Sequence, residues 1–416
     1  MAEAPPGTTL PPLDLPTLQL WTRNIGQAQQ MMLQFWADQD HDGDASVIEA
    51  AAGTAGATTG RLMPDLGQAV TSWATQSEKL VNRQIEFWNQ SLDLWHHFID
   101  PEASAKEPPI RADRDPRIDA DAWRAQPFFD LIRQSYLLVA DHLMQGIDNL
   151  EGLDEAQRSR LHFFTQQMVD AMSPANFFAT NPEVIARTLE TNGENLLRGL
   201  SHMLEDIGRG QITQGDPNAF EVGRNIAATP GKVIYETRLF QIIQYEPTTK
   251  AVIAQPLLFF PPWINRFYIL DLSPRKSLIK WAVDQGLSVF MVSWKSADET
   301  LADVTFDDYV LAQNEAIDVV RDLLDVERVH TVGYCVAGTT LAQTLAWLAA
   351  KGEADKVASA TFFTAQVDFA TAGDLNLFVD DQQLQLADAL AGDKGYLDGR
   401  YMAATFNLLR GRDLIW

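Results

Sequence analysis

The hexapeptide Gly333-Tyr334-Cys335-Val336-Ala337-Gly338 decides how the second half of this chain folds. A strand-like run, 329–332, precedes it, and a helix-like run, 339–345, follows it. A nucleophile on so sharp a strand-to-helix turn needs small residues two positions before it and two positions after it. Gly333 and Ala337 meet this requirement, and Gly338 is a third small residue at the turn. We therefore expect the Cys335 thiol to be held out above a sheet.

This pattern is the nucleophile elbow of an α/β-hydrolase, with cysteine in place of serine. Cys335 is the only cysteine of the 416 residues, so it cannot form an internal disulfide or belong to a thiolate metal cluster. A merely buried thiol is the alternative, since free cysteine is among the most buried residue types. The strand, turn and helix around Cys335 favour the reactive thiol.

Composition excludes several classes of partner. A formal net charge of -24 argues against nucleic acid or an anionic lipid surface, since both favour clusters of Lys and Arg. The first residues carry neither the positive nor the apolar region of a signal peptide, and no apolar run is long enough to span a bilayer. We expect a cytoplasmic globular protein without a cofactor.

Residues 1–111 are expected to form a flexible arm with amphipathic helices. The second of these helices carries an apolar seam with alternating steps of four and three, formed by Val81, Ile85, Trp88, Leu92, Trp95 and Ile99. Packing against the rest of the chain is the simpler interpretation of this seam. Docking on a partner helix or on an apolar particle is the alternative.

The same arm contains a loop, Asp38 to Glu49, that fits the calcium-binding pattern of an EF-hand without a gap. Its eighth position is Ala45, where a branched apolar residue is usual, and an Ala/Gly linker follows it. The sequence holds no second loop of this kind to pair with it. An acidic, solvated linker is therefore the favoured interpretation, and no metal site is expected.

Two further regions follow the arm. In residues 112–220 apolar residues recur with the period of an α-helix. Pro174 and Pro182 stand where proline fits the first position of a helix. From residue 221 to 416 the pattern changes to α/β: strands are expected at 232–236, 239–245, 256–260, 287–294 and 358–364. Ser273-Pro274 is expected to begin a helix that ends near Gly286, and Thr305 and Asp308 suggest a capping box.

The oxyanion hole of such an enzyme takes one N–H from the residue after the nucleophile and one from the loop after an earlier strand. Here these are Val336 and the loop 261–265. Because proline has no N–H, the second donor is Trp263, Ile264 or Asn265, and we choose Ile264. A thiol nucleophile suits acyl transfer from a thioester, because the acyl group stays activated on the enzyme.

The general base is expected to be a His that follows the nucleophile. All seven histidines precede Cys335, and His330 in the elbow strand is most simply structural. We therefore expect the sequence to stop before its hydrolase domain is complete, and this polypeptide to be inactive for want of its catalytic Asp and His.

Beyond the elbow, four longer runs resemble the class I poly(3-hydroxyalkanoate) synthases, which make polyhydroxybutyrate. They are DAMSPANF (170–177), AFEVGRN (219–225), PPWINRFYILDL (261–272) and FMVSW (290–294). The resemblance runs from Asp121 to the end. That family usually has Gly where this chain has Ala337, and its members continue well beyond residue 416.

The resemblance implies that Cys335 accepts the acyl group of 3-hydroxyacyl-CoA, that Val336 and Ile264 hold the oxyanion, and that the growing polyester chain lies on a granule surface. It also implies a homodimer in the complete protein and the opening part of a lid at 366–416. Two alternatives remain: an intracellular polyhydroxyalkanoate depolymerase with a cysteine nucleophile, and a non-catalytic granule-associated protein.

Overall fold

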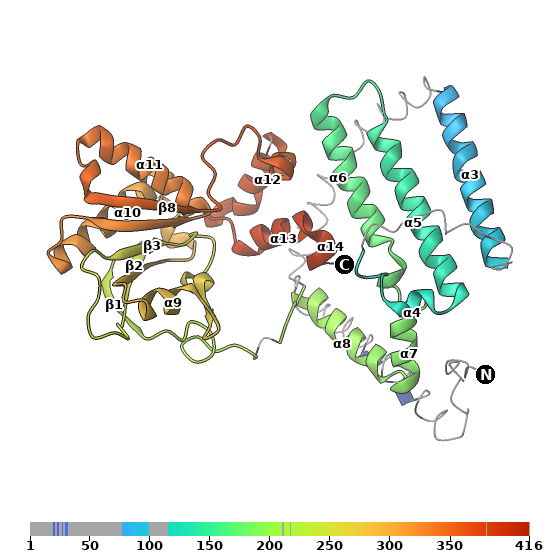
Figure 1. Ribbon diagram of the computed structural model, residues 1–416, viewed down its shortest axis with the longest axis horizontal. Coiled ribbons are helices and arrows are strands. Elements are labelled where there is room, and N and C mark those ends of the chain that lie inside the picture. Colours follow the sequence, from blue (N-terminus) through green and yellow to red (C-terminus); the bar gives the residue numbers. More distant parts are fainter. Residues whose placement is uncertain are drawn as a thin grey trace. The chain divides into compact units, whose positions relative to one another are not determined.

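A computed structural model describes residues 20, 23, 24, 27, 30, 31, 77–99, 115–209, 212–216, 218–379 and 381–415. The chain divides into two compact units (Figure 1). We call them the helical unit (Met1–Gln214, Leu377–Gln383 and Ala404–Trp416) and the sheet unit (Gly215–Asn376 and Leu384–Ala403). The loop Asp38 to Glu49 lies outside the described residues. Within the described residues, no group of three His, Cys, Asp or Glu could hold a metal ion, and no helix has the length and hydropathy to cross a bilayer.

Capping residues set the ends of several helices in the helical unit. Asp154 and Gln157 form a reciprocal capping box, and Asn181 caps a helix that starts at Pro182. The predictions for Pro174 and Pro182 are confirmed, because each is the first residue of a helical turn. The helices are α3 (Ser77–Ile99), α4 (Asp121–Arg124), α5 (Pro127–Asp148), α6 (Glu155–Ala171), η1 (Pro174–Asn176), α7 (Pro182–Glu190), α8 (Glu194–Arg209) and α14 (Gly411–Leu414).

Helix α3 has two apolar faces. One packs on α5: the Phe87 ring lies 4.6 Å from the His142 ring, and Leu94 is buried. The other is the seam of alternating steps, and its six side chains are between 53% and 73% exposed. The seam is therefore not the face that packs on α5, because Phe87 and Leu94 form that contact instead.

The sheet unit is built on six strands in the order β1-β2-β6-β3-β7-β8. The strands are β1 (Gly231–Glu236), β2 (Phe240–Tyr245), β3 (Leu257–Phe260), β6 (Val289–Trp294), β7 (Val329–Tyr334) and β8 (Val357–Phe363). The β1-β2 and β2-β6 pairs are antiparallel, and all pairs from β6 to β8 are parallel. The carboxyl ends of four strands therefore meet at one edge, where ligands bind in open α/β sheets.

Helices cover both faces of this sheet (Figure 1). The side chains of Phe290 and Val292 in β6 join the core with α10 (Phe306–Leu324) and α11 (Val336–Lys351). Met291, between them, joins the opposite core with α9 (Leu278–Asp284). This alternation follows the two-residue period of a strand with both faces buried. The fold is α/β with a mostly parallel sheet, which is compatible with an α/β-hydrolase.

One predicted helix begins later than the sequence indicates. Ser273-Pro274 does not start it: β4 (Asp271–Ser273) and β5 (Lys276–Ser277) form a short antiparallel pair, and Ser277 caps α9. The buried Asp271 carboxylate accepts hydrogen bonds from Ser277 Oγ at 2.6 Å and Thr229 Oγ1 at 2.7 Å, which fixes this hairpin. The capping box of Thr305 and Asp308, by contrast, is confirmed at the start of α10.

Candidate active site

Cys335 occupies the turn between β7 and α11. Its φ of 53° and ψ of -127° lie in a region that non-glycine residues rarely adopt and that costs about 1–3 kcal/mol. Three backbone hydrogen bonds hold it there: Cys335 N–H donates to Phe363 O at 2.9 Å, and the N–H groups of Gly338 and Thr339 donate to Cys335 O at 2.8 Å and 3.1 Å. Strain of this kind persists where the surroundings over-determine it, and it is common at active sites.

Small residues make this turn possible. A Cβ on Gly333 would lie 2.6 Å from Gly338 Cα, so strand and helix touch backbone to backbone. Ala337 is fully buried, and its carbonyl accepts a 2.9 Å hydrogen bond from Gln313 Nε2. Gln313 Oε1 in turn accepts the Thr344 hydroxyl at 2.9 Å. Sequence reasoning missed this buried polar support, because Gln313 lies on α10 and no local motif marks it.

The loop after β3 leaves the sheet beside the elbow, since Phe260 pairs with Gly333 in the parallel register. Of the three candidate donors in this loop, Asn265 N–H already donates to Pro262 O at 3.1 Å. The Trp263 ring stacks on Tyr309 at 4.2 Å between centroids, which anchors the loop to α10. Ile264 lies between these two fixed residues and is 42% exposed.

Val336 is the first residue of α11. The first four N–H groups of an α-helix have no intrahelical acceptor, so the Val336 N–H is available to an external oxygen. The positive end of the helix dipole lies at the same point and favours negative charge there. Cys335 itself is partly exposed.

His330 lies in β7 but at the other end of the strand from the elbow. Its Nδ1 is 2.7 Å from Ser359 Oγ, and its Nε2 is 3.2 Å from Gln255 Oε1. These contacts are those of a structural residue. The other described histidines, His96, His97, His142, His162 and His202, all lie in the helical unit, and His41 lies outside the described residues.

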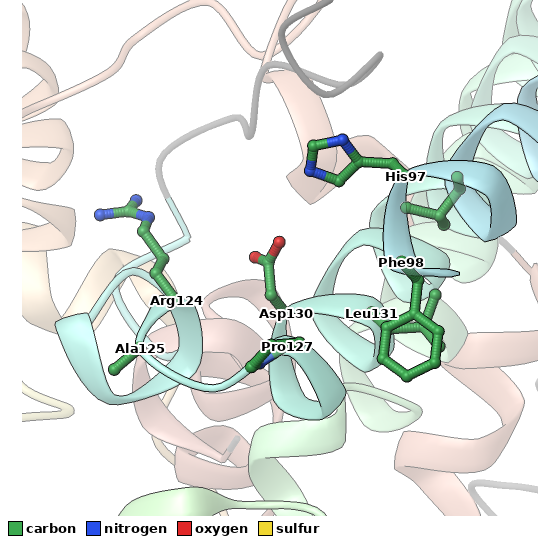
Figure 2. A pocket seen from close by; sticks show the side chains of 8 residues that line it. His97, Phe98, Arg124, Ala125, Pro127, Asp130 and Leu131 are labelled. Atoms are coloured by element: carbon green, nitrogen blue, oxygen red, sulfur yellow. The ribbon is translucent and has the colours of Figure 1, made fainter. Parts of the chain in front are cut away.

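A pocket of about 200 Å³ lies within the helical unit, between the end of α3 and the start of α5 (Figure 2). Figure 2 shows the His97 and Asp130 side chains extending into the space between the two helices, with Phe98 and Leu131 among the other lining residues. The Asp130 carboxylate is bound by Arg133 at 2.7 Å, so its charge is already paired. The volume is below the 300–1,000 Å³ usual for small-molecule sites, and we assign no ligand to it.

The fold and the elbow together define an α/β protein with a candidate thiol nucleophile at the carboxyl edge of its sheet. Residues 114–282 match the family model described as "Poly-beta-hydroxybutyrate polymerase (PhaC) N-terminus". With the relatives described next, this match shows that the chain belongs to the poly(3-hydroxyalkanoate) polymerase family.

Three relatives document this membership, all named poly(3-hydroxyalkanoate) polymerase or its PhaC subunit. The Rhizobium meliloti protein is 41% identical over 85% of this chain and 59% of its own length. The Methylorubrum extorquens protein is 42% identical over 84% of this chain and 59% of its own length. The Cupriavidus necator protein is 44% identical over 78% of this chain and 55% of its own length. The chain thus spans a little over half the length of the curated relatives that it matches.

Proposed function

We propose that Cys335 is the acyl acceptor of a poly(3-hydroxyalkanoate) polymerase that uses 3-hydroxyacyl-CoA, of which 3-hydroxybutyryl-CoA is the first substrate to test. The observation that carries this proposal is the strained backbone of Cys335 at the junction of β7 and α11. A thiol on a turn of this kind is expected to stand clear of the sheet, next to the Val336 N–H at the start of α11.

In the first step the Cys335 thiolate attacks the thioester carbonyl carbon. The C=O π bond opens to a tetrahedral oxyanion, which then collapses and breaks the bond from carbon to the CoA sulfur. The products are an acyl-Cys335 thioester and CoA thiol, which gains the proton that Cys335 loses. This exchange is nearly isoenergetic because one thioester replaces another, and the acyl group stays activated for a hydroxyl nucleophile.

The oxyanion is held by the N–H groups of Val336 and Ile264 in this proposal. Val336 is supported by its place as the first residue of α11. Ile264 is supported by the loop geometry, since the Asn265 N–H is used within the loop and the Trp263 ring is fixed on Tyr309. Removing one oxyanion-hole donor typically costs about 10²–10³ in rate.

Acyl transfer can be tested directly because Cys335 is the only cysteine. The purified chain is incubated for a long single turnover with labelled 3-hydroxybutyryl-CoA, and the peptide that carries Cys335 is examined by mass spectrometry. We expect an adduct that hydroxylamine removes, and no adduct in Cys335→Ala. A label that persists in Cys335→Ala contradicts the proposal, and release of free 3-hydroxybutyrate from added polyester, without acylation by 3-hydroxybutyryl-CoA, favours the depolymerase instead.

The growing polyester and its granule surface are the proposed partners, and a homodimer is the proposed assembly. The exposed seam of α3 supports an apolar partner, because Trp88 and Trp95 are 59% and 53% exposed on one face. We expect Trp88→Lys with Trp95→Lys to lower the fraction of protein bound to isolated polyester granules. Val139→Lys, an exposed apolar position on α5, is the matched control. Unchanged partitioning of the double variant contradicts this role for the seam.

A further inference from the structure

One arginine of the sheet unit lies at the same edge of the sheet as the elbow. Arg266 is in the loop after β3, and Phe260 at the end of β3 pairs with Gly333 near the end of β7. The Arg266 side chain reaches the strand on the other side: its Nη1 donates to Ser296 Oγ at 2.7 Å, just after β6. Strand β3 lies between β6 and β7, and neighbouring strands are about 4.8 Å apart, so β6 and β7 are separated by about 10 Å.

The loop that carries Arg266 is fixed on the end of β6. Pro261 O accepts a buried hydrogen bond from Trp294 Nε1 at 2.8 Å. The Trp263 ring packs edge-on against the Trp294 ring, at 6.4 Å between centroids. With the loop and the Ser296 contact already in place, an anion that binds Arg266 has little ordering to pay for.

The charge of Arg266 is exposed and uncompensated. Among the described residues no carboxylate forms an ion pair with it, and its one side-chain partner, Ser296, is neutral. Two cations near the carboxyl end of β6 differ in this respect, because Lys295 pairs with Asp298 at 3.1 Å and Arg238 pairs with Asp303. The remaining N–H groups of the Arg266 guanidinium suit phosphate oxygens, which they can bind in pairs.

Carboxylates surround this cation along the chain. The loop after β6 and the first turn of α10 carry Asp298, Glu299, Asp303, Asp307 and Asp308. The whole chain has a formal net charge of -24. An anion that approaches this edge is repelled by these carboxylates, so an unpaired cation has a strong effect on where the anion binds.

We propose that Arg266 binds the phosphate groups of the CoA thioester whose acyl end lies at Cys335. The inference rests on the proposed function, which makes an acyl-CoA the substrate. CoA carries its phosphates at the far end of a flexible pantetheine arm, so their partner must stand away from the thiol on the same edge of the sheet. Arg266 meets this requirement, because β3 separates the strand ends that carry Ser296 and Cys335.

The first test measures the affinity of the full chain for CoA by isothermal titration calorimetry. In Arg266→Gln we expect the dissociation constant to rise about fivefold or more, because a charge-assisted contact is lost. Arg266→Lys should keep part of the affinity, since it retains the charge but not the planar fork. Added salt should weaken binding more in the wild type than in Arg266→Gln. Arg328→Gln is the matched control, because Arg328 is also exposed but directly precedes β7, at the opposite edge of the sheet.

The second test separates phosphate binding from damage to the loop. Single-turnover acylation of Cys335 is compared for 3-hydroxybutyryl-CoA and for the N-acetylcysteamine thioester of 3-hydroxybutyrate, which has no phosphate. Arg266→Gln should raise the half-saturating concentration of the CoA thioester and leave its limiting rate close to that of the wild type. The phosphate-free thioester should react with both proteins alike. An equal loss with both thioesters overturns the proposal, because Arg266 would then act on the shape of the loop.

Three results of the titration overturn the proposal as well. These are equal CoA affinity in the wild type and Arg266→Gln, an equal loss in Arg328→Gln, and no binding of CoA by the wild type. Failure of the proposed function is separable. CoA binding that depends on Arg266, without acylation of Cys335, refutes acyl transfer and retains the phosphate contact.

Discussion

Gly333 and Gly338 touch across the turn that carries Cys335: a Cβ on Gly333 would lie 2.6 Å from Gly338 Cα and 3.2 Å from its nitrogen. Real Cβ atoms do not approach backbone this closely, so strand β7 and helix α11 can meet at this distance only through two glycines. The position of the thiol therefore depends on residues that carry no functional group.

We expect Gly333→Ala and Gly338→Ala to destabilise the sheet unit by about 1–3 kcal/mol or more, the usual cost of overpacking. In Gly338→Ala the new methyl group would also meet Ala365 and the Gly333 carbonyl. Thermal unfolding followed by circular dichroism measures the change. Gly199→Ala on α8 is the control, since nothing lies within 4 Å of its added Cβ. Wild-type stability in both elbow variants would show that the turn is not so tight.

Substitutions of Ala337, the second residue of α11, test the same turn. Ala337→Gly should be nearly silent or mildly destabilising, whereas Ala337→Val places a β-branched side chain at a fully buried position whose carbonyl is held by Gln313. We expect Val to cost about 1–3 kcal/mol and to shift the thiol relative to the Val336 N–H. The rate of acyl-Cys335 formation measures that shift. Equal rates in wild type and Ala337→Val would contradict the elbow assignment.

The 416-residue polypeptide contains no histidine after Cys335. Loss of a general base typically slows proton transfer by about 10²–10⁴-fold, so we expect steady-state CoA release at background level. Added imidazole should raise the single-turnover rate of Cys335 acylation, because it supplies a base from solution. CoA release is followed with a thiol-reactive dye. Turnover equal to that of a full-length relative would show that another group in this chain acts as the base.

The local parts of the fold were predictable from the sequence. The strand-elbow-helix order around Cys335, the capping box of Thr305 and the proline starts are each set by residues within a few positions of one another. The start of α9 at Leu278 was not predictable, because a buried Asp271 carboxylate builds a hairpin from groups as distant as Thr229.

The candidate site shows the same division. Cys335 and its small neighbours follow from the motif, but the buried support from Gln313 and Thr344 comes from α10 packing on α11, which no local pattern encodes. The ion pair of Arg412 with Asp170, both in the helical unit, joins residues 242 positions apart. The seam of α3 shows what the period of apolar residues cannot predict. The period predicts an apolar face of the helix, but it does not say which of the two apolar faces packs on α5.

We expect low pH to destabilise the helical unit because the Asp115 carboxylate becomes protonated. Burial alone would raise the pKa of this carboxyl, but the hydrogen bonds and charge of Arg117 outweigh burial and hold the pKa below its ordinary value of 3.8. The unfolded chain therefore binds the proton more readily than the folded one, so the stabilisation is present above pH 3.8 and is lost as the pH falls from there through the folded pKa.

Asp115→Asn should remove this pH-dependent part and lower the stability at pH 7 by about 1–3 kcal/mol, because the Arg117 charge loses its carboxylate partner. Unfolding by urea at pH 7, 5 and 3, followed by circular dichroism, measures both effects. Asp119→Asn is the control, since Asp119 pairs with Arg124 at the surface, where such pairs contribute little. If Asp115→Asn and the wild type lost stability in parallel between pH 5 and pH 3, the acid sensitivity would lie in other carboxylates and not in the Asp115–Arg117 pair.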